Sequence, residues 1–98
     1  MAFVQVIEFH TKDPDGVQEI SAQWEKATEG KRTARRQIVT RDRNEPDRYL
    51  AMVFFDSYES AMENSRLPET EASAAQYGEV VEGQPLFHDL DVLSDDQL

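Results

Sequence analysis

Residues 48–66 read RYLAMVFFDSYESAMENSR, and the first part of this stretch decides the fold. Tyr49 to Phe55 is an almost unbroken run of apolar, strand-forming residues, and Asp56 ends it. Successive side chains of a strand point to opposite faces, and here both sets are apolar: Tyr49, Ala51, Val53 and Phe55 on one face, Leu50, Met52 and Phe54 on the other. Such a strand needs a cover on both faces, and the rest of the chain has to supply it.

Before this strand, the sequence predicts a strand, a helix and a second strand. The first strand covers residues 3–11, and the helix that follows carries apolar residues at helical spacing: Val17, Ile20, Trp24 and Ala27. Two caps are open for that helix, Asp13 ahead of Pro14 or Asp15 with Gln18. The second strand covers residues 33–43, and the turn at residues 44–47 makes it the hairpin partner of the strand quoted above.

After this strand, the sequence predicts two helical pieces and a last strand. Residues 57–66 and 69–77 form the helical pieces, which Pro68 separates. Gly78 and the turn Gly83-Gln84-Pro85 then lead to a strand over residues 86–93. Residues 94–98 form an acidic tail that we expect to be mobile.

This order predicts a single α+β domain over residues 1–93, with a ferredoxin-like βαββαβ arrangement. In that arrangement a four-stranded antiparallel sheet carries its helices on one face. The other face of the sheet is left without a cover, and the hydrophobic fraction of 39% is low for a chain of 98 residues. The sequence therefore predicts a homodimer, in which a second copy supplies the missing cover.

The amino-acid composition excludes several kinds of site and argues against several kinds of partner. The chain has no Cys, which excludes disulfides, thiolate catalysis and zinc–sulfur sites, and which favours the cytoplasm. The start of the chain does not resemble a signal peptide, and no apolar run is long enough to span a bilayer. A formal net charge of −10 argues against nucleic acids and anionic membranes as partners.

The two histidines, His10 and His88, are the candidate catalytic residues. The first and last strands of this fold are antiparallel neighbours, so His10 near the end of one and His88 near the start of the other come close. A neutral imidazole is a competent general base near pH 7. The alternative is that both are ordinary strand-end residues. We expect any site to lie between the sheet and the helices, with one histidine facing it, and we expect no metal because two histidines lack a third ligand.

Four further residues are candidates for binding a small aromatic or anionic ligand. The pattern favours Trp24 and Tyr58 as core residues, and the functional alternative is that they offer aromatic surfaces on which a ligand stacks. Arg36 and Arg41 could neutralise a carboxylate or phenolate, or could pair with an acidic residue of a partner subunit.

The element order, the segment Val53-Phe54-Phe55-Asp56-Ser57-Tyr58-Glu59-Ser60-Ala61-Met62 and the closing Phe87-His88-Asp89-Leu90-Asp91-Val92 resemble antibiotic-biosynthesis-monooxygenase proteins, including small members with no assigned activity. The resemblance covers nearly the whole chain and implies a homodimeric α/β barrel with a pocket between sheet and helices. The superfamily includes cofactor-free quinol and anthrone oxygenases, haem-degrading oxygenases, isomerases and proteins without a known reaction, so the fold does not settle the function.

The haem-degrading branch of that superfamily has a His on the second helix, a Trp near the end of the preceding strand and an Asn on the first strand. This chain has Asn64 and Ser65, Phe54-Phe55-Asp56, and Gln5 with Ile7 at those places. We therefore expect no haem and no other cofactor. The sequence favours a non-catalytic or small-ligand-binding module; the alternative is a cofactor-free monooxygenase acting on a small aromatic or polyketide-type molecule.

Overall fold

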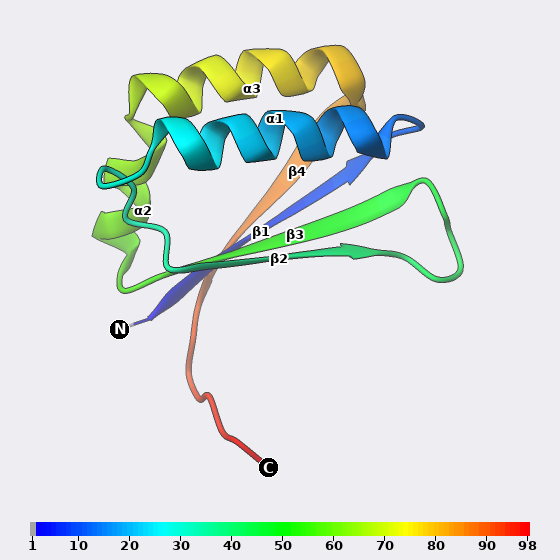
Figure 1. Cartoon of the computed structure of the whole chain (residues 1–98). Helices are drawn as coiled ribbons and strands as arrows, with labels where there is room; N and C mark the ends of the chain where they lie inside the picture. The colour runs from blue at the N-terminus through cyan, green and yellow to red at the C-terminus, as the bar shows by residue number, and fades with distance from the viewer. Residues whose placement is uncertain (1) are drawn as a thin grey trace.

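The computed structural model describes residues 2–98 as one four-stranded sheet with three helices. The elements are β1 (Phe3–His10), α1 (Pro14–Ala27), β2 (Arg36–Arg41), β3 (Arg48–Phe55), α2 (Tyr58–Ser65), α3 (Pro68–Val80) and β4 (Glu82–Asp91). The strands pair antiparallel in the order β2-β3-β1-β4. In Figure 1, α1 and α3 lie side by side over one face of the sheet, and no element of residues 2–98 covers the other. The predicted α+β, ferredoxin-like fold with helices on one face is confirmed.

The core lies between the sheet and the helices. One cluster joins Phe3, Phe55 and Ala61, and Val53 packs against it. A second cluster joins Phe9, Tyr49 and Ala51, with the Phe9 and Tyr49 rings stacked at a centroid distance of 5.5 Å. The strand residues of both clusters belong to one parity of β1 and β3, so this parity is the helix-covered face. The other parity of β3, Leu50, Met52 and Phe54, remains only half-buried.

Helices α1 and α2 begin where side chains satisfy their first amide groups. Asp13 caps α1, since its carboxylate accepts a hydrogen bond from the Gly16 amide at 3.0 Å, and Pro14 occupies the first helical position. This decides between the two caps that the sequence left open. Ser57 caps α2 in the same way by accepting from the Ser60 amide at 3.1 Å. Within residues 2–98, none of these helices is long and apolar enough to cross a membrane.

Two predicted boundaries near the end of the chain are wrong. Gly78 lies inside α3, which continues to Val80, because Gly lowers helix stability without forbidding the conformation. Strand β4 begins at Glu82, so the residues Gly83-Gln84-Pro85 that we expected as a turn lie within it. Pro85 is tolerated there because β4 is an edge strand, where a missing amide donor need not break a ladder bond.

Candidate functional site

The sheet face opposite the helices carries both polar and apolar side chains. Cross-strand partners share a face, and the register pairs Val4 with Phe54 and Val6 with Met52. Phe3 and Phe9, which belong to the other parity of β1, are buried under the helices. We call the opposite surface the open face, and its side chains are Val4, Val6, Glu8, His10, Arg36, Ile38, Thr40, Arg48, Leu50, Met52, Phe54, Leu86, His88 and Leu90.

Both histidines lie on the open face. His10 is the cross-strand partner of Arg48, and His88 is the partner of Val6. The expectation that one histidine faces the space between sheet and helices is therefore wrong. Alternation within a strand shows which residues share a face, but it does not show which face the helices cover when both are apolar.

A cluster of charged side chains surrounds Glu8 on this face. The Arg48 guanidinium donates from Nε to Glu8 Oε2 at 3.1 Å and from Nη1 to Asp42 Oδ2 at 2.8 Å. His88 Nε2 lies 3.8 Å from Glu8 Oε1, and His10 Nε2 lies 3.6 Å from Glu45 Oε1. We call Glu8, Asp42, Arg48 and His88 the Glu8 cluster. It joins three strands and the hairpin loop.

The carboxylates of Glu8 and Asp42 and the guanidinium of Arg48 are held in their charged forms. The hydrogen bond from Arg48 keeps the pKa of the Glu8 carboxyl below its usual value, with smaller contributions from the charges of Arg48 and the two histidines. The pKa of Asp42 is lowered first by the Asn44 amide and then by Arg48. The side chains of Glu8, Asp42 and Arg48 are only 19%, 22% and 27% exposed. A fixed carboxylate beside an imidazole can accept a hydrogen bond from a hydroxyl group.

Sequence reasoning missed Glu8, Asp42 and Arg48 as site residues. A signal was present for Glu8, because it is a charged residue on the same parity as Val4, Val6 and His10. For Asp42 no such signal exists, since its approach to Arg48 depends on the shape of the hairpin loop. No group of three or more His, Asp and Glu residues in the described part of the chain is placed to hold a metal ion.

The two aromatic candidates lie on the helix side. Trp24 joins the helices, because its indole Nε1 donates to Thr70 Oγ1 at 2.9 Å, and the Arg32 guanidinium lies over its ring. Tyr58 begins α2 and meets the Phe3 ring edge-on at 5.5 Å, while remaining 48% exposed. The structure therefore does not bring Trp24 or Tyr58 together with either histidine.

The two arginine candidates lie on the edge strand β2 but on opposite faces. Arg36 is on the open face as the partner of Phe54, and its guanidinium lies 5.9 Å from the centroid of that ring. Arg41 pairs with Tyr49 on the helix side and lines a surface hollow of 410 Å³ with Asp42, Arg43 and Pro46. Of the two, only Arg36 shares a face with the Glu8 cluster.

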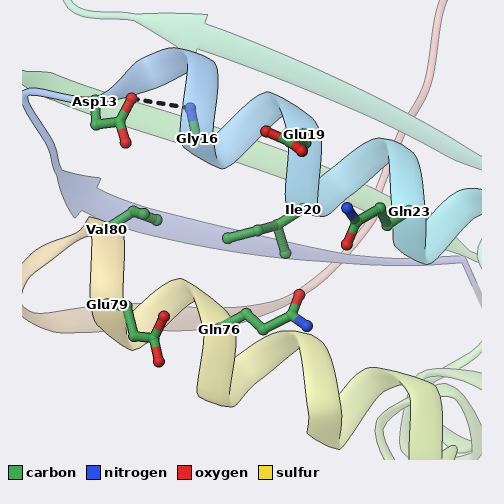
Figure 2. Close-up of a pocket in the computed structure, with 8 residues that line it drawn as sticks. All are labelled: Asp13, Gly16, Glu19, Ile20, Gln23, Gln76, Glu79 and Val80. Atoms are coloured by element: carbon green, nitrogen blue, oxygen red, sulfur yellow. Dashed lines mark hydrogen bonds between the residues drawn. The ribbon is translucent and has the colours of Figure 1, made fainter.

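A groove of 370 Å³ runs between α1 and α3 (Figure 2). Ile20 and Val80 extend into the space between the helices, and carboxylates and amides surround them. The polar lining consists of Asp13, Glu19, Gln23, Gln76 and Glu79. None of the six predicted site residues lines this groove, and Asp13 is already engaged as the cap of α1.

Comparisons with known proteins find similar proteins by structure and not by sequence. No family model and no curated protein matches this sequence. A protein from Caulobacter crescentus CB15, provisionally named an antibiotic biosynthesis monooxygenase, superposes with a TM-score of 0.81 at 14% identity, over 95% of this chain and 91% of that one. The chain has the fold of these monooxygenase-like proteins. The resemblance predicted from the sequence is thus confirmed at the level of fold.

Two other solved structures with this fold show its breadth. SnoaB, a cofactor-independent oxygenase from Streptomyces nogalater, gives a TM-score of 0.80 at 10% identity and covers 96% of this chain and 95% of its own. Rv0793 from Mycobacterium tuberculosis gives 0.78 at 14% identity and covers 99% of this chain and 100% of its own. At such identities the similarity defines the architecture and leaves the chemistry to the residues.

Asn64, the α2 residue compared above with a histidine of haem-degrading proteins, has a structural contact here. Its side chain is buried, and its Oδ1 accepts a hydrogen bond from the Thr33 amide at 3.2 Å. This bond ties α2 to the segment that leads into β2. A buried amide that is engaged with the backbone stabilises the fold.

Proposed function

We propose that this chain is a homodimeric, non-catalytic module whose open sheet face packs against the same face of a second copy. The observation that carries the proposal is the open face itself, where apolar side chains of all four strands stand with no cover from residues 2–98. Leu86 and Leu90 are 55% and 46% exposed on it. Contiguous exposed apolar surface of this kind is typical of an interaction site.

A second copy would cover the face of strand β3 that the helices leave open. Strand β3 is apolar on both faces, and its own helices cover only one. Two sheets that pack face to face lie about 10 Å apart and fill the space with their inner side chains. An interface of the obligate kind usually buries more than about 2,000 Å² in total.

We place the ligand of this module between the two sheets, next to Glu8 and His88. Glu8 Oε1 is not the oxygen that binds Arg48, and it lies beside the His88 imidazole. Within an apolar interface such a pair suits a small aromatic molecule with a hydroxyl group, because the ring packs on the aliphatic side chains and the hydroxyl group donates to the carboxylate. The space between sheet and helices is already occupied by the two core clusters.

The proposal is tested by sedimentation of one pair of variants. Met52→Asp places a carboxylate in the middle of the open face, whereas the matched control Val39→Asp places one on the same sheet at a position that is 54% exposed on the helix side. We expect wild type and Val39→Asp to sediment at about twice the chain mass of 11.3 kDa, and Met52→Asp at the mass of one chain. A folded monomeric wild type, or a dimeric Met52→Asp, contradicts the proposal.

The ligand is tested separately by calorimetry with a panel of small phenols, quinols and anthrones. We expect at least one to bind, more weakly to His88→Gln, and none to be converted. Oxygen consumption that depends on His88 would overturn the non-catalytic assignment and favour a cofactor-free oxygenase.

A further inference from the structure

The two edges of the sheet carry opposite charges. Strand β2 and its approach, residues 33–41, hold Arg35, Arg36 and Arg41 and no acidic residue. Strand β4 and the segment after it hold carboxylates: Glu82, Asp89, Asp91, Asp95 and Asp96. The strand order β2-β3-β1-β4 places these two sets at opposite edges of one sheet, so they do not neutralise each other within the strand ladder.

Arg36 is the cation on this basic edge that points toward the interface. It lies on the open face, while Arg35 is held by Asp56 at 2.7 Å. The ion pairs formed among residues 2–98 do not include Arg36. Its guanidinium rests on the Phe54 ring, which leaves its forked donors available to a carboxylate.

The acidic segment leaves the sheet toward the side on which the second copy would lie. The Val92 amide donates to the Ala2 carbonyl at 2.9 Å, and the chain then turns away from the body. In Figure 1 the C-terminal end, coloured red, runs from β4 to the side opposite the helices. Leu93 is 88% exposed, and Asp95 and Asp96 take part in no ion pair within residues 2–98.

Charge selects one of two symmetric ways to stack the sheets. A two-fold axis that runs across the strands would place β2 on β2 and β4 on β4, so the acidic segment that follows β4 would lie far from the partner's Arg36. A two-fold axis that runs along the strands places β4 of one copy over β2 of its partner with the same ends aligned. The register shows which residues share an end, since Asp91 pairs with Phe3, Phe3 with Phe55, and Arg36 with Phe54.

We propose that the acidic C-terminal segment of each copy binds the partner's Arg36 through Asp95 and Asp96, at the rim of the sheet–sheet interface. This inference rests on the proposed homodimer and adds its orientation. Because the dimer has a two-fold axis, the contact occurs twice, once from the C-terminal segment of each copy.

Cysteine cross-linking tests the contact directly, because the natural chain contains no Cys. Under mild oxidation, we expect Arg36→Cys/Asp95→Cys to form a covalent dimer on a non-reducing gel. The matched control is Thr40→Cys/Asp95→Cys, with Thr40 on the same strand and face but roughly 13 Å further along. We expect the control to cross-link much more slowly. A bond within one chain, or equal rates for the two pairs, would overturn the inference.

A charge exchange gives an independent measurement. We expect Arg36→Glu alone, and Asp95→Lys/Asp96→Lys alone, each to raise the dimer dissociation constant about tenfold, because two symmetric rim ion pairs are lost. The combined variant should recover most of the wild-type affinity, and the differences should shrink in high salt. A dimeric wild type with no recovery in the combined variant overturns this inference alone, whereas a monomeric wild type overturns the proposed function as well.

Discussion

At the residue scale, Glu8 and Arg48 show how a charged pair is kept on an apolar surface. Arg48 sits between two carboxylates and donates to both, at 3.1 Å to Glu8 and at 2.8 Å to Asp42. Each of these carboxyls has a lowered pKa in the folded chain. A pair that is held in this way resists separation, and covering it with a second copy removes water that would otherwise screen the charges.

These lowered pKa values predict how stability depends on pH. A carboxyl whose folded pKa lies below its unfolded value stabilises the fold above the unfolded value, here near 4.5 for Glu8 and 3.8 for Asp42, and this contribution is lost as pH falls through the folded value. In Arg48→Met we expect a smaller loss of stability between pH 5 and pH 3 than in wild type. Arg66→Met is the control, since Arg66 is exposed and belongs to no ion pair of residues 2–98.

Urea denaturation over a series of pH values, at one protein concentration, measures this difference. Equal pH dependence of stability in Arg48→Met and Arg66→Met would show that Arg48 does not lower the pKa of Glu8. The difference between the two variants reports mainly on Glu8, because the Asn44 amide continues to lower the pKa of Asp42 in Arg48→Met.

At the element scale, strand β3 presents one face to the helices and the other to the proposed partner. Val53 lies on the helix-covered face and packs against the cluster of Phe3, Phe55 and Ala61, whereas its neighbour Met52 lies on the open face. We expect Val53→Asp to unfold the protein, because an unpaired carboxylate in that cluster costs several kcal/mol. Met52→Asp should instead retain the far-UV circular dichroism of the fold at room temperature, while losing the dimer and melting below wild type. Wild-type melting of Val53→Asp would contradict the packing described here.

How far the sequence predicts this structure differs between elements and faces. The order of elements could be predicted because each has a distinct period, such as Val17, Ile20 and Trp24 in α1. The start of β4 could not, because Gly83 and Pro85 have the composition of a turn and only the edge position makes them compatible with a strand. The Glu8 cluster depends on pairing between residues about 40 positions apart, which local patterns do not report.

At the scale of the whole molecule, the helices cover one face of the sheet and leave the other open. The helix-covered face holds the buried residues of both core clusters, and the open face holds half-buried and exposed apolar side chains around the Glu8 cluster. A chain of 98 residues buries only about two-thirds of its unfolded surface, so stability gained at an interface is a large share of the total. Folding and association should therefore be coupled.

This coupling predicts that the melting temperature depends on protein concentration. If two folded copies share the open face, mass action stabilises the dimer as concentration rises, so wild type should melt several degrees higher at 200 μM than at 2 μM, about a hundredfold range. Met52→Asp should melt lower and at the same temperature at both concentrations, while Val39→Asp, whose substituted side chain is exposed on the helix side, should follow wild type. Calorimetric scans of the three proteins at the two concentrations make the comparison. A melting temperature of wild type that does not change with concentration would mean that each copy is stable with its open face in water, and the exposed Leu86 and Leu90 would then need another explanation.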